Sequence, residues 1–243
     1  MEASLLHWNY LISASEHRPF MQSITAAIVL AIGLSAAFIS GIQLATGNGV
    51  TESQNAQAKN VLAEMGGVSV FQGLPVSDLT FIDENGRDIE LSSLQGQRSL
   101  LFFGYTYCPD VWPVTLMHLG KVWKQLSAEQ QSQWRVVMVS VDPERDKGAP
   151  LKQYMDHFHP QFTALTGRPD SLRSITTEVQ GFYGRVQRED GGYLLDHSAN
   201  LVVLDTALNY RGYIEPPHTP ERLQKIMEQL SVLMPLPAEP STQ

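Results

Sequence analysis

An uncharged apolar run near the N-terminus constrains this chain more than any other sequence feature. Residues 24–44 (ITAAIVLAIGLSAAFISGIQL) form 21 consecutive positions without one Asp, Glu, Lys or Arg. As a helix rising about 1.5 Å per residue, the run would cover about 32 Å, close to the roughly 30 Å of a bilayer's hydrocarbon core. A buried core helix is the alternative, but the short mixed segment 1–23 offers little to pack around it. We therefore predict one transmembrane helix at residues 24–44.

Charges on either side of this run predict its orientation. Arg18 and the α-amino group precede it, and no Lys or Arg follows until Lys59. The positive-inside tendency then keeps residues 1–23 in the cytoplasm and exports the rest of the chain. The exported side is the periplasm of a bacterium, which we expect here, or the intermembrane space of a mitochondrion. A cleaved signal peptide stays open as an alternative because Ala45-Thr46-Gly47 is a passable cleavage site, although signal peptides usually have shorter apolar regions of about 7–15 residues.

Composition limits what the exported part can be. Hydrophobic residues make up 43% of the chain and charged residues 17%, which excludes wholesale disorder and a polytopic membrane protein. The net charge of −8, with no run rich in Lys and Arg, argues against nucleic acid as the main partner. The single cysteine, Cys108, rules out an intramolecular disulfide and a cysteine-rich zinc site.

The exported part divides by composition into three segments. Residues 45–69 are mostly small and polar, which predicts a linker, with a frayed helix over residues 45–66 as the alternative. Residues 70–232 carry the apolar periodicity of a folded domain, and residues 233–243 are a Pro-rich tail. The domain boundaries therefore follow changes in residue type along the chain.

Apolar periodicity in the domain predicts a mixed α/β fold. Continuous apolar runs at 99–104 and 135–141 predict strands that are covered on both faces. Asn85-Gly86 between two short strand-like runs predicts a hairpin. Thr219 followed by Pro220 predicts the start of the last helix. One central mixed sheet with helices on both sides accounts for this order of elements.

The candidate reactive residue is Cys108, which follows the first buried strand and precedes a helix. Ligands and reactive groups gather at the carboxyl ends of such strands, and a helix N-terminus favours a thiolate. A small buried hydrophobe is the ordinary alternative for a cysteine. Because Cys108-Pro109 breaks the strand just before the helix, the position favours a reactive or metal-binding thiol.

The histidines are less informative on residue type alone. We expect His218 to be solvated before the last helix and His118 to lie at the surface. His197 stands in Leu195-Asp196-His197-Ser198, where a candidate hairpin leads into the next strand, and a lone loop histidine is seldom a ligand. The acidic segment Asp142-Pro143-Glu144-Arg145-Asp146 predicts a polar turn on the same sheet edge as Cys108.

Three sequence blocks together resemble the SCO/SenC family, whose members are membrane-tethered, thioredoxin-like copper proteins that help mature cytochrome c oxidase. The blocks are LFFGYTYCPDVWPVTL at 101–116, VSVDPERDKGAPLKQYMDHFHPQFTALTG at 139–167 and YLLDHSANLVVLDTALNYRG at 193–212. The resemblance covers roughly residues 70–232. It implies a thioredoxin-like central mixed sheet with flanking helices, preceded here by the predicted transmembrane helix.

The resemblance also implies a copper site, with one departure. The family's ligands are two cysteines and a distant histidine, and Cys108 and His197 match the first cysteine and the histidine. Trp112 stands where the second cysteine is expected. Two thiolates and an imidazole suit Cu(I), so the loss of one thiolate implies a weakened site. Dithiol exchange is excluded because no second cysteine can resolve a mixed disulfide.

The resulting hypothesis is a non-enzymatic, metallochaperone-like protein that binds copper, with Cu(I) favoured. Its implied partners are the membrane and a cytochrome c oxidase subunit or another copper-handling protein. The alternative is a single-cysteine thiol redox enzyme or sensor that uses Cys108. A scaffold protein that has kept the fold and lost the metal stays open as well.

Overall fold

The computed structural model describes residues 51–109 and 111–237. These described residues belong to one compact unit. The predicted cytoplasmic segment 1–23 and transmembrane helix 24–44 lie outside the described residues. Within the described ranges, no helix combines the length and apolarity needed to cross a membrane.

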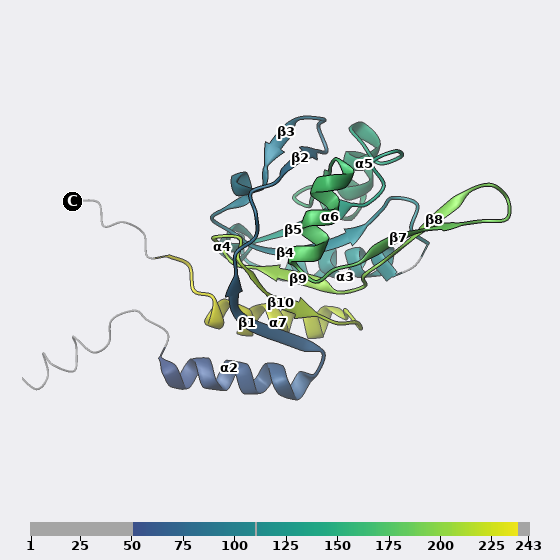
Figure 1. The fold of residues 1–243 in the computed structure, drawn as a ribbon. Coiled ribbons are helices and arrows are strands. Elements are labelled where there is room, and N and C mark those ends of the chain that lie inside the picture. The colour runs from purple at the N-terminus through teal and green to yellow at the C-terminus, as the bar shows by residue number, and fades with distance from the viewer. Residues whose placement is uncertain (1–50, 110, 238–243) are drawn as a thin grey trace, which may run out of the picture. The chain divides into compact units, whose positions relative to one another are not determined.

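Strands and helices alternate along the described chain as in a mixed α/β domain (Figure 1). The strands are β1 (Val68–Leu74), β2 (Thr80–Asp83), β3 (Asp88–Glu90), β4 (Arg98–Gly104), β5 (Trp134–Ser140), β6 (Thr163–Thr166), β7 (Tyr183–Gln187), β8 (Tyr193–His197), β9 (Leu201–Leu204) and β10 (Tyr210–Ile214). The helices are α2 (Glu52–Met65), α3 (Val111–Gln125), α4 (Ala128–Gln133), α5 (Ala149–Phe158), α6 (Pro169–Glu178) and α7 (Pro220–Leu233), with a 3-10 turn at Leu91–Leu94.

The main sheet has β4 and β5 at its centre. Its order is β1-β10-β9-β4-β5-β6-β2-β3, in which β4, β5 and β6 run parallel and the other neighbouring pairs run antiparallel. Every residue of β4 is buried, as expected for the continuous apolar run at its heart. The predicted central mixed sheet is therefore confirmed.

Helices cover both faces of this sheet, as adjacent residues of β4 show. Phe102 stacks on Trp112 of α3, with ring centroids 4.2 Å apart. The next residue, Phe103, points to the other face and packs against Gly181, just after α6. Figure 1 accordingly shows α6 in front of the sheet and α3 behind it. The predicted flanking of the sheet by helices is confirmed.

The N-terminal part of the described chain forms a helix, the second of the two alternatives considered for the segment before residue 67. Helix α2 begins with a capping box in which Thr51 and Gln54 satisfy each other's backbone N–H groups. It packs against α7 and buries Ala58 and Leu62. Because only these two side chains of an otherwise polar helix are buried, its composition resembles that of a solvated linker.

Strands β7 and β8 form a separate two-stranded hairpin that projects from the body of the molecule (Figure 1). The pairing runs from Tyr183 opposite His197 to Gln187 opposite Tyr193. Its turn contains Gly191 at a φ of 82°, a conformation that favours glycine. The candidate hairpin that leads from His197 into the next strand is confirmed, and its base meets the main sheet where His197 lies.

Candidate metal centre

Cys108 lies in the connection between the central strand and helix α3. Strand β4 ends at Gly104, and the Cys108 backbone N–H donates to the Tyr105 carbonyl at 3.1 Å, which closes a tight turn. Helix α3 begins at Val111, three residues later. Cys108 is only 6% exposed. The thiol therefore sits in a shallow, largely covered position just before a helix.

His197 is the last residue of β8, at the base of the hairpin, and its side chain is partly buried. The structure brings it to Cys108: the Sγ and Nε2 atoms are 3.3 Å apart although 89 positions separate the residues. These two side chains, one predicted from its position and one from the resemblance, meet at a single point. Their contact is the core of the candidate centre.

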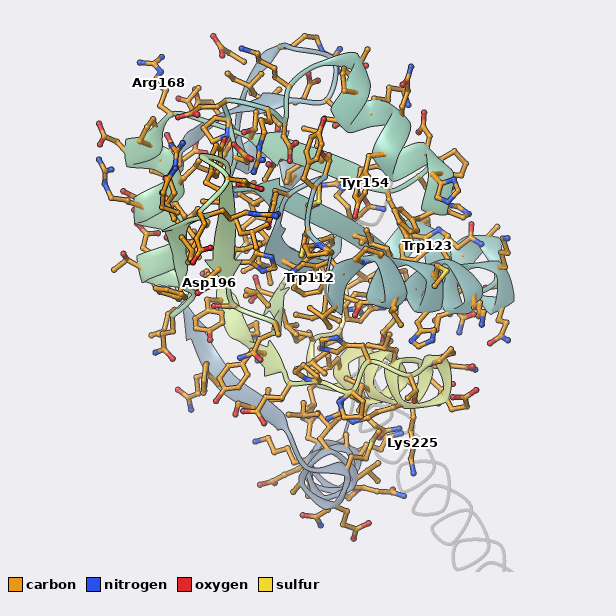
Figure 2. The ribbon with its side chains drawn as sticks, turned by 90° about the vertical axis from the view of Figure 1, so that its right-hand side faces the viewer. Trp112, Trp123, Tyr154, Arg168, Asp196 and Lys225 are labelled. Carbon is orange, nitrogen blue, oxygen red and sulfur yellow. The ribbon has the colours of Figure 1, made fainter. Side chains whose placement is uncertain are left out.

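Trp112 forms the inner wall of the centre. Its side chain is fully buried in the first turn of α3, and Figure 2 shows it in the interior of the molecule, with Trp123 further along the same helix. The indole Nε1–H donates a hydrogen bond to Nδ1 of His197 at 3.1 Å. Trp112 therefore contacts the imidazole directly and is more than a cover for the sulfur.

Tyr105 and Ser198 also contact the imidazole of His197. The Tyr105 ring meets the imidazole edge-to-face, with ring centroids 5.7 Å apart. The Ser198 carbonyl oxygen lies 3.3 Å from Nδ1. A cleft of about 380 Å³ opens in front of the pair and is lined by both side chains, by Tyr105 and by Phe182, which is 59% exposed. A small ion or a partner side chain can reach the centre through this cleft.

The acidic segment after β5 braces the turn that carries Cys108. Asp146 is 1% exposed, and its carboxylate accepts hydrogen bonds from the Thr106 backbone N–H at 2.8 Å and hydroxyl at 2.6 Å. It also accepts one from the Ser140 hydroxyl at 2.7 Å. The segment is a polar turn, as predicted, and its last carboxylate ties the cysteine turn to the sheet.

The same segment holds the hairpin that carries His197. Tyr193, at the start of β8, donates its hydroxyl to Asp142 at 2.8 Å. Its ring lies between the guanidinium groups of Arg145 and Arg185, at 3.9 and 3.6 Å from the ring centroid. Burial and the hydrogen bond to Asp142 raise the pKa of Tyr193 to about 12. The hairpin is thus fixed by a side chain that we did not single out from the sequence.

His218 is buried, so the prediction that it would be solvated is wrong. It is 4% exposed and stacks against Trp112, with ring centroids 6.0 Å apart. Its Nε2–H donates to the Ile214 carbonyl at 3.1 Å, and its Nδ1 pairs with the Thr115 hydroxyl at 3.2 Å. Burial lowers the pKa of His218 below its usual value. The segment before α7 folds back over α3, which the sequence alone does not indicate.

The sequence missed several residues that shape the centre, namely Tyr105, Thr106 and Tyr193. Tyr105 and Thr106 stand three and two positions before Cys108, in the block that also contains Trp112. The one available signal was their place in the same strand-to-helix connection.

His118, expected at the surface, is half-buried and donates from Nδ1 to the His218 carbonyl at 2.8 Å.

The donor set of the centre suits a soft metal ion. A thiolate sulfur selects Cu(I) over harder metals, and an imidazole nitrogen suits copper as well. Across residues 51–109 and 111–237, no group of three or more His, Cys, Asp or Glu side chains could hold a metal ion. The described centre therefore offers two candidate ligands, and a third would have to come from outside this pair.

Comparison with known proteins places the chain in a defined group. The model of the family described as SCO1/SenC matches residues 72–231. An SCO2-like protein of Rickettsia felis is 31% identical over 153 residues, which are 62% of this chain and 74% of that protein. The sequence similarity therefore spans nearly the whole described domain after α2.

Solved structures agree with this sequence similarity. The copper-bound ScoI of Bradyrhizobium japonicum superimposes with a TM-score of 0.58 at 29% identity, covering 64% of this chain and 99% of that one. The copper-bound ScoI of Arabidopsis thaliana gives 0.59 at 27% identity, covering 64% and 97%. The fold is the thioredoxin-like α/β arrangement that the resemblance implied. The matched domain, its fold and its sequence together show that this chain belongs to the SCO1/SenC family.

Proposed function

We propose that this protein binds copper between Cys108 and His197 and acts as a metallochaperone-like protein. The observation that supports it most directly is the 3.3 Å approach of Sγ and Nε2 from elements far apart in the sequence. Two relatives of similar fold were solved with copper bound, which supports the same metal here. Copper is the cargo of such a protein, and Cu(I) is the form that a sulfur and an imidazole favour.

The proposed site is weaker than one with two thiolates. Trp112 fills the position of the second family cysteine, so Cu(I) receives two ligands from this chain. A third ligand from a partner protein would complete the coordination, and the cleft lined by Phe182 gives that partner access. An incomplete site of this kind suits transfer of copper better than long-term storage, because the cargo is held by few bonds.

The proposed setting follows from the sequence and the family. The apolar run 24–44 anchors the chain in a membrane, and the domain lies on the exported side, in a bacterial periplasm. The proposed client is a cytochrome c oxidase subunit or another copper-handling protein. Extraction of the full chain from membranes by detergent, but not by alkaline carbonate, is the expected result for such an anchor. Release by carbonate would contradict it.

A Cu(I) titration of the full chain, kept reduced in detergent with a competing chelator, tests the copper proposal. We expect one site that Cys108→Ser abolishes and that His197→Ala weakens at least tenfold, because each removes one of two ligands. His157→Ala is the matched control, since His157 is an exposed histidine of α5. Unchanged binding in His197→Ala would contradict the shared site.

The thiol redox alternative has less support in the geometry. Thr106, the threonine nearest to Cys108 in the sequence, turns its hydroxyl to Asp146. Arg145 is paired with Asp142 and lies over the rings of three tyrosines. Rapid consumption of peroxide that depends on Cys108 and ignores His197 would favour this alternative over copper binding.

A further inference from the structure

The Nδ1 atom of His197 faces two groups of opposite character. The indole N–H of Trp112, which can only donate, lies 3.1 Å away. The Ser198 carbonyl oxygen, which can only accept, lies 3.3 Å away. A neutral imidazole carries one proton, on Nδ1 or on Nε2, so it can satisfy only one of these neighbours at a time.

In the first tautomer the proton is on Nε2. The Nδ1 lone pair then accepts the Trp112 N–H, and Nε2–H points to Cys108 Sγ at 3.3 Å. All three side chains are linked in one hydrogen-bonded chain. In this tautomer neither ring nitrogen presents a lone pair to a metal ion, because Nε2 is protonated and Nδ1 is occupied.

In the second tautomer the proton is on Nδ1. Nδ1–H donates to the Ser198 carbonyl, and the Nε2 lone pair faces Cys108, where a metal ion would be shared. Metal-bound histidines usually donate their other ring N–H to a carbonyl or carboxylate in this way. This tautomer, however, sets Nδ1–H against the Trp112 N–H and takes away that buried donor's acceptor. A buried polar group that loses its partner is unfavourable.

We propose that Trp112 is a positioning residue that holds His197 in the Nε2–H tautomer and thereby opposes metal binding by this histidine. The inference deepens the proposed copper function and rests on it for its consequence. Copper capture then requires His197 to change tautomer and the indole to give up its hydrogen bond. Trp112 therefore lowers the copper affinity in two ways. It replaces a cysteine thiolate, and its N–H competes with the metal ion for the imidazole.

The tautomer itself is tested on the metal-free full chain without reference to copper. Nitrogen NMR of the histidine rings, with His197→Gln to assign the signal, distinguishes a protonated from an unprotonated Nδ1. We expect unprotonated Nδ1 and protonated Nε2 in the wild type. Trp112→Phe keeps an aromatic ring against Phe102 and removes the N–H, so we expect the signal to shift toward the Nδ1–H tautomer.

The consequence for copper is tested with the same variant. We expect Trp112→Phe to bind Cu(I) about tenfold more tightly than the wild type, although it adds no ligand, because no buried N–H loses its acceptor. Trp134→Phe is the matched control: its buried indole N–H donates to the Ser231 hydroxyl at 3.1 Å, outside the centre. We expect its Cu(I) affinity to equal that of the wild type.

Two results would overturn the proposal. One is a wild-type His197 protonated on Nδ1, or a tautomer that Trp112→Phe leaves unchanged. The other is equal Cu(I) affinity in the wild type and Trp112→Phe. If instead no variant binds Cu(I) in a manner that depends on Cys108, the copper function fails and its affinity consequence falls with it. The NMR measurement then still decides whether Trp112 sets the tautomer.

Discussion

At the scale of single residues, the chemistry of the centre depends on one side chain that cannot bind copper. Trp112 is fully buried against the Phe102 ring and the imidazole of His197. Its position in the first turn of α3 directs it toward the same point as Cys108. A shorter side chain with a sulfur at this position would therefore be aimed at the proposed ion.

Replacement of Trp112 by Cys is expected to raise the Cu(I) affinity by roughly a hundredfold or more. The variant adds a second thiolate held close to the first, and a tethered extra ligand acts at high effective concentration. Chelator competition on the reduced full chain measures the gain. Val114→Cys is the matched control, because Val114 lies on the same helix but is 49% exposed. No gain in Trp112→Cys, or an equal gain in Val114→Cys, would mean that position 112 does not converge on the ion.

The sequence indicated Cys108 and His197 as candidate ligands, but it did not indicate which side chains surround them. Cys108 could be singled out from its place between strand and helix, and His197 from the family resemblance. That Trp112 donates to His197 depends on the orientation of two rings, which no residue pattern encodes. His218 was misjudged because its burial results from a loop that folds back over Thr115.

At the scale of elements, the hairpin of β7 and β8 positions His197 next to Cys108. The turn end of its paired region is held to the acidic segment after β5 by the hydrogen bond from the Tyr193 hydroxyl to the Asp142 carboxylate. The cysteine turn is tied to the same segment through Asp146. One loop therefore sets the positions of both proposed ligands.

Removing the Tyr193 hydroxyl is expected to loosen the hairpin. Tyr193→Phe keeps the ring between its two guanidinium groups but loses the hydrogen bond to Asp142, which should lower the free energy of unfolding by about 1 kcal/mol. Amide hydrogen exchange should quicken in residues 183–197 more than in the main sheet. Tyr213→Phe, on β10, is the matched control. Unchanged exchange in the hairpin would show that Tyr193 does not hold it.

Elements with strong apolar patterns were predictable, and those with weak patterns were not. The strands at 99–104 and 135–141 correspond to β4 and β5 because both are buried on two faces. Strand β1 was missed because most of its residues are only partly buried and its pairing shifts register between Val70 and Leu74. Helix α2 could not be distinguished from a linker in the sequence because it buries only Ala58 and Leu62.

At the scale of the whole molecule, long-range pairing creates the centre. Strand β9 lies antiparallel to β4 although about a hundred residues separate them in the chain, and this pairing seats the base of the hairpin beside the cysteine turn. Strand order of this kind cannot be read from local periodicity. The family resemblance was therefore the only sequence signal that linked Cys108 to His197.

Acid is expected to weaken the fold through His218. Burial lowers the pKa of His218 despite its hydrogen bond to the Ile214 carbonyl, whereas an unfolded chain has the ordinary value of about 6.5. Protonation therefore favours the unfolded chain. The stability that His218 contributes is full above about pH 6.5 and declines as the pH falls below it toward the folded-state pKa.

Urea unfolding between about pH 8 and about pH 5 measures this dependence. We expect His218→Gln to be less stable than the wild type at neutral pH, because it disrupts the bonds to Thr115 and Ile214, but to lose less stability on acidification. His157→Gln is the matched control, since that side chain is exposed. Parallel pH curves for the wild type and His218→Gln would rule out this residue as the source.

The separation of 89 positions between the two proposed ligands has a consequence for the stability of the chain against heat and proteolysis. An ion bonded to both would act as a cross-link that closes a long loop, and such closure removes conformational freedom from the denatured ensemble. Loaded molecules would then resist heating and proteases better than empty ones. Release of copper would leave the metal-free protein, which is the form more readily degraded. Degradation of the protein would therefore follow copper release.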